Sequence, residues 1–221
     1  MGPMSTYGVM ADRIGDELMV GGRTDLEPQV QRAIQSAILH YRAHPLWFNR
    51  GVKTAATVNG DFTQARPSGL ITCDAIRVDH GQGFFDMERA AFKKLLAWRQ
   101  GSVASGKPYR WAEFAESVYL YPTPDAAYNL EFYGLIDLAA LSADGDTNAW
   151  MVEGEPLIRQ RARALVQIDV LKDGEAKAEA LQIAAMGGPG RHCLSLMERA
   201  ALSELRAQSN RRLATGKVAP G

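Results

Sequence analysis

The strongest constraint on the fold is a change of sequence pattern at about residue 51 and again near residue 137. Before the first change, Val30, Ile34, Ile38 and Tyr41 recur at spacings of three and four, which is typical of one face of a helix. Between the two changes, short runs rich in Thr, Val, Ile, Tyr and Phe are separated by Gly, Pro, Asp and Asn, which indicates strands. The sequence therefore predicts an α+β fold that is mainly α, a helical bundle with a small inserted antiparallel β-sheet and a flexible C-terminal tail.

Four segments follow from this pattern. Residues 1–50 are expected to supply the N-terminal helices of the core, and residues 51–136 an inserted β-rich region that contains one helix, Phe85–Trp98. Residues 137–212 are expected to supply the C-terminal helices of the core. Residues 213–221 contain Gly and Pro without periodicity, so they are expected to form the flexible tail.

Local signals refine the helical part. Thr24 and Glu27 have the spacing of a capping box, which predicts the start of the second helix. Pro45 ends that helix, because the residue before a proline is pushed out of helical geometry. The bulky Trp47 and the later Trp150 are expected to be buried in the helical core.

A hairpin is the simplest interpretation of the strands near residue 120. Val118 and Leu120 alternate with tyrosines, and Leu130 and Phe132 alternate with polar residues. The intervening Pro122–Asp125 stretch is a turn signal, since proline fixes φ and aspartate bonds the backbone ahead. We therefore expect these two strands to pair with each other.

Composition excludes several classes of protein. The 221 residues contain 25 basic and 25 acidic side chains, whereas a protein that grips a nucleic-acid backbone has a basic surplus. No apolar run approaches the length of a membrane span, so no membrane contact is expected. The two cysteines, Cys73 and Cys193, lie far apart and form no C-x-x-C pair, which favours a reducing compartment, the cytoplasm.

The stretch Gly101–Pro108, GSVASGKP, resembles a phosphate-binding loop with its eighth position replaced. That position should carry a hydroxyl for Mg²⁺, but Pro108 has neither a hydroxyl nor a backbone N–H. The segment before it has helical spacing instead of ending a buried strand. The pattern favours a connection from a helix to an extended segment over a nucleotide site.

A second stretch places Asp144, Asp146, Asn148 and Glu155 at positions one, three, five and twelve of a calcium loop. The sixth position should be glycine but is Ala149. In a calcium loop, Ala149 would have to adopt a left-handed conformation, at a free-energy cost of about 1 kcal/mol. The favoured interpretation is a polar loop in which Asp146 or Asn148 caps the following helix.

Other candidate sites are weak. His40 and His44 have i, i+4 spacing, but no glutamate lies between them, so surface or cap histidines are favoured over a zinc site. His192 and Cys193 are neighbours in sequence and do not face each other as a catalytic dyad. The arginines of the last helix suit a solvated face or an acidic protein partner; they are Arg199, Arg206, Arg211 and Arg212.

The order of several short motifs resembles the head–tail adaptor, or connector, proteins of tailed phages. Two N-terminal helices run into the sequence PLWFN, and further matching segments follow along nearly the whole chain. The segments are Pro45–Asn49, Gly106–Tyr109, Leu120–Tyr128, Asp146–Met151 and the closing Thr215, Gly216, Val218 and Pro220.

The resemblance implies a structural virion protein without catalytic, cofactor-binding or metal-binding residues. Its implied partners are the portal ring above, a tail or stopper/nozzle protein below, and a ring of about twelve copies of itself through which DNA passes without specific binding. It implies a location at the head–tail junction of the virion, after assembly in the bacterial host cytoplasm. The implied portal contacts lie in the C-terminal segment, at Arg211, Arg212, Leu213, Thr215, Gly216, Lys217, Val218 and Pro220.

Two other classes of function remain as alternatives. One is a calcium- or nucleotide-binding hydrolase, which stoichiometric metal or ATP binding would favour. The other is a DNA-binding module, which a salt-sensitive affinity for duplex DNA would favour. Within the adaptor interpretation, deletion of Leu213–Gly221 is expected to leave the fold intact and abolish portal docking.

Overall fold

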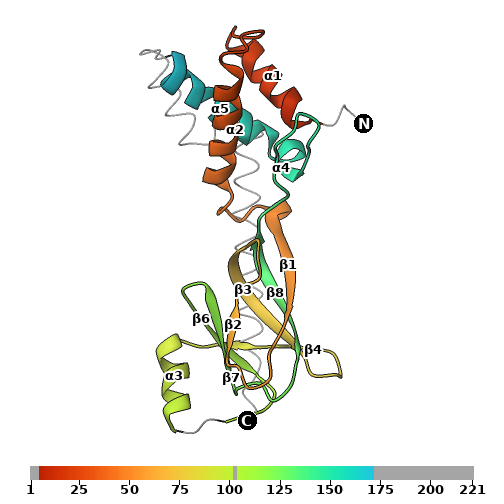
Figure 1. Ribbon diagram of the computed structural model, residues 1–221, viewed down its shortest axis with the longest axis vertical. Coiled ribbons are helices and arrows are strands. Elements are labelled where there is room, and N and C mark those ends of the chain that lie inside the picture. Colours follow the sequence, from red (N-terminus) through yellow and green to blue (C-terminus); the bar gives the residue numbers. More distant parts are fainter. Residues whose placement is uncertain (1–4, 102–103, 172–221) are drawn as a thin grey trace, which may run out of the picture. The chain divides into compact units, whose positions relative to one another are not determined.

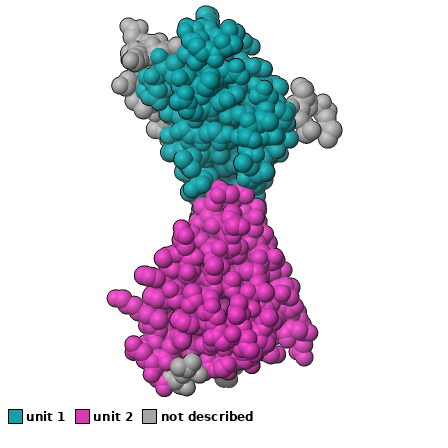
Figure 2. Space-filling view, viewed as in Figure 1, with its two compact units in different colours: residues 1–49, 138–221 teal, residues 50–137 magenta. Residues whose placement is uncertain are grey.

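The computed structural model describes residues 5–101 and 104–171. It divides into two compact units, which Figure 2 shows in different colours. The helical unit joins residues before 50 to residues after 137, and the strand unit consists of residues 50–137. Each unit has its own hydrophobic core. Two helices that the helical spacing predicts within residues 137–212, at 174–186 and at about 193–211, lie outside the described residues, as does the tail.

Short helices build the helical unit (Figure 1). They are α1 (Tyr7–Glu17), α2 (Glu27–Tyr41), the 3-10 turn η1 (Trp47–Asn49), α4 (Ala149–Val152), α5 (Glu155–Val166) and the π-helical η2 (Gln167–Leu171). The hydroxyl oxygen of Thr6 accepts from the amide of Val9 and so caps α1. Both α2 and α5 carry proline in the first turn, where its missing N–H leaves no helical bond unmade.

The core of the helical unit forms where α2 packs against α5 and α1. Ile14, Ile34, Met151 and Ile158 come from four different helices and are fully buried. Burying a side chain of this size contributes about 1.5–3 kcal/mol. Because these residues come from both sides of the strand unit in sequence, the helical unit is complete only when the two distant segments of the chain meet.

Tryptophan burial follows the prediction at one position. Trp150 is 3% exposed, and its ring meets that of Phe48 edge-on at a centroid distance of 5.0 Å. Trp47 is half-buried against the same core. The prediction for Trp150 is confirmed, whereas Trp47 lies at the border of the core.

The predicted capping box at Thr24 is wrong. The residue before α2 is Leu26, and no side chain caps the helix. Residues 23–26 form a turn in which the amide of Leu26 donates to the carbonyl oxygen of Arg23. This turn moves the helix start past Thr24, so that its hydroxyl is too early to reach the first free amides.

The described residues of the strand unit form eight strands in two sheets. The strands are β1 (Arg50–Ala56), β2 (Thr63–Ala65), β3 (Leu70–Asp79), β4 (Phe84–Asp86), β5 (Glu88–Arg89), β6 (Arg110–Phe114), β7 (Ser117–Tyr121) and β8 (Asn129–Ile136). Sheet A has the order β1-β8-β3-β4, and sheet B the order β2-β7-β6-β5. A helix, α3 (Phe92–Gly101), connects β5 to β6 and packs on β6 and β7 (Figure 1).

The two sheets share one core. Phe132 and Ile76 from sheet A, and Trp111 and Leu120 from sheet B, are at most 1% exposed and belong to the same cluster. Their strand neighbours point the other way, as the two-residue period of a strand requires. The unit is therefore a two-layer sandwich whose outer faces are separate surfaces.

The predicted fold class is wrong in its proportions. Among the described residues, helices hold 36% and strands 27%, and two four-stranded sheets replace the one small sheet. The sheets are also not purely antiparallel, because β5 pairs with β6 in parallel. Three of the eight strands are only two or three residues long, which is too short for alternation to show in the sequence.

The predicted hairpin is also wrong. Strand β7 pairs with β2 and β6, whereas β8 pairs with β1 and β3, so the two strands belong to different sheets. Pro122 and Pro124 lack the N–H groups that would continue a ladder, and the segment between the strands crosses from one sheet to the other. The apolar residues of both strands do alternate with polar ones, but they face the shared core from two different sheets.

The predicted helix Phe85–Trp98 begins too early. Phe85 lies in β4, and Met87 is buried in the sandwich core, donating its amide to the carbonyl oxygen of Ile76. Helix α3 begins only at Phe92. Met87 and Leu95 have helical spacing only by coincidence. Met87 is buried in the sandwich core, whereas Leu95 is buried between α3 and the outer face of sheet B.

Candidate functional site

The residues predicted to contact the portal all lie outside the described part of the chain. They are Arg211, Arg212, Leu213, Thr215, Gly216, Lys217, Val218 and Pro220. His192, Cys193, Arg199 and Arg206 lie outside it as well. The candidate sites that the structure describes are therefore the loop that resembles a phosphate-binding loop, the loop that resembles a calcium site, the histidine pair and the cavities of the helical unit.

The loop after α3 is a structural connection. It leads from Gly101 to the strand β6, whereas a phosphate-binding loop opens a helix. The carbonyl oxygen of Pro108 lies 3.2 Å from Nε2 of His80, and Nζ of Lys107 donates to the carbonyl oxygen of His80 at 3.4 Å. The lysine that would contact phosphate instead joins two loops of the strand unit.

The calcium-like loop is held together by its own carboxylate. Oδ2 of Asp146 accepts from the backbone amides of Ser142 and Ala143 at 2.7 and 2.8 Å. The amides of Ala143 and Ser142 hold the pKa of the Asp146 carboxyl below its usual range. One proposed metal ligand is thus occupied by backbone donors.

The other calcium-like positions are also occupied. Oδ1 of Asn148 accepts from the amide of Trp150 at 2.8 Å, which caps α4 and confirms the capping prediction. Nδ2 of Asn148 donates to the carbonyl oxygen of Ala139 at 2.7 Å. Glu155 accepts from Arg13 at 3.0 Å. These side chains orient helices in the helical unit and do not converge on one point.

The same loop binds the start of α1. The amides of Tyr7 and Gly8 donate to the carbonyl oxygens of Asp146 and Asp144, at 2.9 and 3.0 Å. Residues more than a hundred positions apart are thereby joined. The sequence motif that resembled a metal site is the connection between the N-terminal helix and the returning chain.

The histidine pair has no metal-site geometry. The rings of His40 and His44 are 5.8 Å apart and tilted, and both contact the ring of Tyr41. Burial lowers the pKa of His40, and the nearby Arg161 and His44 lower it further. Within the described ranges, no three His, Cys, Asp or Glu side chains are grouped so that they could hold a metal ion.

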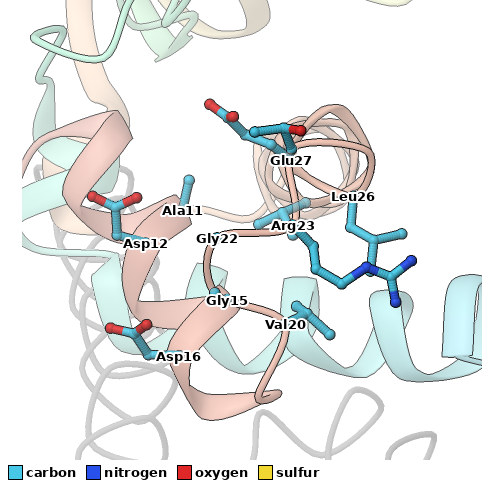
Figure 3. Close-up of a pocket in the computed structure, with 12 residues that line it drawn as sticks. Ala11, Asp12, Gly15, Asp16, Val20, Gly22, Arg23, Leu26 and Glu27 are labelled. Carbon is cyan, nitrogen blue, oxygen red and sulfur yellow. The ribbon is translucent and has the colours of Figure 1, made fainter.

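A polar cavity of about 400 Å³ lies between α1 and α2, beside the loop that connects them (Figure 3). Asp12 and Asp16 project from α1, and Glu27 from the start of α2. None of these three carboxylates makes an ion pair with a described residue. Arg23 borders the cavity but is paired with Asp25 at 2.6 Å.

A second cavity of about 290 Å³ adjoins the first. The two share Ala11, Asp12 and Glu27, and the second extends to Asp144. The combined groove is acidic, so it repels phosphate groups and nucleotides. Its lining contains no histidine, cysteine or lysine that could act as a base or nucleophile. No local sequence pattern predicts this groove, because it depends on how α1 packs against α2.

The one described cysteine is buried. Cys73 is 3% exposed in the sandwich core. Burial, with the Glu113 carboxylate as a smaller cause, raises the pKa of its thiol to about 12. A thiol in this state is a poor nucleophile at neutral pH. No described helix has the length and apolar character that crossing a membrane requires.

The comparisons with known proteins give one result. The model of the family described as SU10 adaptor protein matches residues 5–219. Among curated proteins, none matches the chain. The family match covers both units and all of the predicted portal contacts except Pro220. The chain therefore belongs to the SU10 adaptor protein family and is a structural adaptor protein of a phage.

Proposed function

We propose that this chain is the head–tail adaptor of a tailed-phage virion and forms a ring of about twelve copies beneath the portal. The ring joins the capsid to the tail and continues the channel for DNA. The observation that carries the proposal is the family match over residues 5–219. The protein acts as a structural part and performs no chemical step.

The charge distribution supports a conduit that does not hold DNA. Several arginines of the strand unit are paired with carboxylates, as in Arg66 with Glu113 at 3.0 Å and Arg110 with Glu88 at 2.7 Å. In the helical unit, the groove carboxylates of Asp12, Asp16 and Glu27 make no ion pair with any residue that the structure describes. Because DNA affinity depends on free cations that displace counterions, this arrangement favours transit over binding.

The proposed portal contact is the C-terminal segment. Its last 17 residues contain four basic side chains and no acidic one. Arg211, Arg212 and Lys217 are the charged members of the proposed site, and Leu213 and Val218 are its larger apolar members. A segment that becomes ordered on docking loses conformational entropy at that step. This loss favours assembly on an existing portal ring over association of free subunits.

The non-enzymatic assignment rests on how the candidate side chains are used. Asp146 and Asn148 satisfy backbone groups, Lys107 joins two loops, and Cys73 is buried with a raised pKa. Each of these residues has a structural task that explains its position. Below the ring, the proposed partner is a tail or stopper/nozzle protein, and assembly takes place in the cytoplasm of the host bacterium.

Deletion of the gene from the phage genome tests the function directly. We expect cells infected with the deletion phage to accumulate heads without tails, and complementation with the full chain to restore complete virions. Complete, infectious virions that lack the chain would contradict the proposal.

A further inference from the structure

The two outer faces of the strand unit differ in how they are covered. Helix α3 packs on the outer face of sheet B, beside β6 and β7 (Figure 1). Leu95 is fully buried there, and the ring of Phe92 stacks on that of Phe114 at 4.5 Å. Among the described residues, no helix packs on sheet A. In the part of the chain that the structure describes, the sandwich thus has one face covered by a helix and one open face.

The exposed side of α3 is basic. The helix contains three cationic residues and no acidic one. Lys93 and Lys94 are exposed, and Lys93 makes no ion pair with a described residue. The exposed Ala97 lies one helical turn after Lys93, so this side of the helix carries a small side chain between the two lysines and the C-terminal end of α3.

The open face of sheet A is acidic and partly apolar. Directly paired residues share a face of a sheet, which places Val52 beside Tyr133, and Glu131 and Asp86 on either side of Arg77. The single Arg77 is shared by Asp86 at 3.2 Å and Glu131 at 3.6 Å, so the row keeps a negative excess. The side chain of Asp86 is 89% exposed, and Val52 is 44% exposed.

The edges of the sheets are poor places for two copies to pair. The edge strands β2, β4 and β5 have only two or three residues. The longer edge strand β1 carries Lys53 opposite Phe132, on the side that faces the core. Short edges and an inward-facing lysine both oppose backbone pairing with another chain. Contacts between copies through this unit are therefore expected to use its faces.

We propose that α3 of one copy packs on the open face of sheet A of the next copy, with Lys93 and Lys94 beside Asp86 and Glu131. The partner is a second copy of this chain, because the two faces have opposite charge. In addition, one face carries a helix, and the other is a sheet without one among the described residues. Faces on opposite sides of a sandwich make a head-to-tail contact, the type that closes into a ring. This inference rests on the proposed ring and names the surfaces that build it.

A charge-reversal rescue tests the contact. The variants are Lys93→Glu with Lys94→Glu, Asp86→Lys, and the combination of all three, each mixed with the portal encoded by the same genome. Each reversal alone is expected to weaken ring formation, measured by native mass against subunit concentration, at least about tenfold. The combined variant is expected to recover ring formation, since opposite charges face each other again.

The control and the outcomes are specific. Glu153→Lys makes the same charge change as Asp86→Lys, but at an exposed position of the helical unit, outside both faces, and is expected to leave assembly unchanged. Circular dichroism checks that every variant is folded. Reversals without effect, or losses that the combined variant does not recover, would overturn the inference and leave the adaptor function standing. Absence of any ring with the unaltered chain would overturn both.

Discussion

Gly8 lies directly against Asp144: a Cβ atom at Gly8 would be 2.7 Å from the Cβ of Asp144. The amide of Gly8 also donates to the carbonyl oxygen of Asp144 at 3.0 Å. Helix α1 and the loop before α4 therefore approach as closely as backbone allows. This contact joins the two chain segments that form the helical unit.

The close approach predicts that Gly8→Val destabilises the helical unit. The added side chain forces the loop away from α1, and overpacking of this kind costs about 1–3 kcal/mol. The matched control is Gly145→Val in the same loop, where an added Cβ meets nothing within 4 Å. Urea unfolding should show a lower midpoint for the Gly8 variant and a nearly unchanged one for the control. Equal midpoints would show that the contact is loose.

The Asp146 carboxylate predicts an acid-sensitive loop. Its pKa is lower in the folded state than the unfolded value of about 3.9, so the ionised form stabilises the fold above that pH. The stabilisation is lost as the pH falls through the folded pKa. Asp146→Asn should therefore lower the melting temperature at neutral pH, and the difference from the unaltered chain should shrink as the pH falls below about 3.9.

Melting curves across this pH range check the prediction. A difference that stays constant down to about pH 2 would mean that the charge of Asp146 contributes nothing. The same protein can be heated with and without Ca²⁺. We expect no change in melting temperature with calcium, because Asp146 and Asn148 already accept backbone hydrogen bonds.

Only part of this architecture could be predicted from the sequence. The spacing of Val30, Ile34 and Tyr41 located α2, because a long amphipathic helix repeats its signal several times. Strands such as β2 and β5 are too short to repeat any signal. Their place in sheet B depends on pairing with β7 and β6, which lie far along the chain.

The site predictions were limited for a related reason. The spacing of Asp144, Asp146 and Asn148 suggested a shared task, and the loop does have one, but its partners are Tyr7 and Gly8 at the other end of the chain. A motif records which side chains are near in sequence and does not record which distant backbone groups they meet. The acidic groove and the open face of sheet A both arise from packing, so no local pattern predicts them.

Burial of Cys73 predicts a thiol that does not react in the folded protein. With its pKa raised to about 12, the thiolate is scarce at mildly alkaline pH. In a Cys193→Ser background, iodoacetamide should label Cys73 slowly in the native protein and rapidly in urea. Similar labelling rates in both conditions would show that the sandwich core opens readily.

The proposed portal site predicts a separation of folding from docking. A chain that ends at Arg212 loses Leu213, Thr215, Gly216, Lys217, Val218 and Pro220 of the site. The deletion removes none of the described residues of either compact unit, so the melting temperature should stay the same. Binding to the portal, measured by co-sedimentation, should disappear. Binding of the truncated chain with full affinity would show that the tail does not contribute to the portal contact.

The most direct test of the adaptor function is the native mass of this chain, alone and after mixing with the portal encoded by the same genome. We predict that a complex with about twelve copies of the chain forms on the portal. The same preparation gives the copy number and the partner in one measurement. A chain that stays apart from the portal at every concentration, with its native mass unchanged by mixing, would contradict the proposed function.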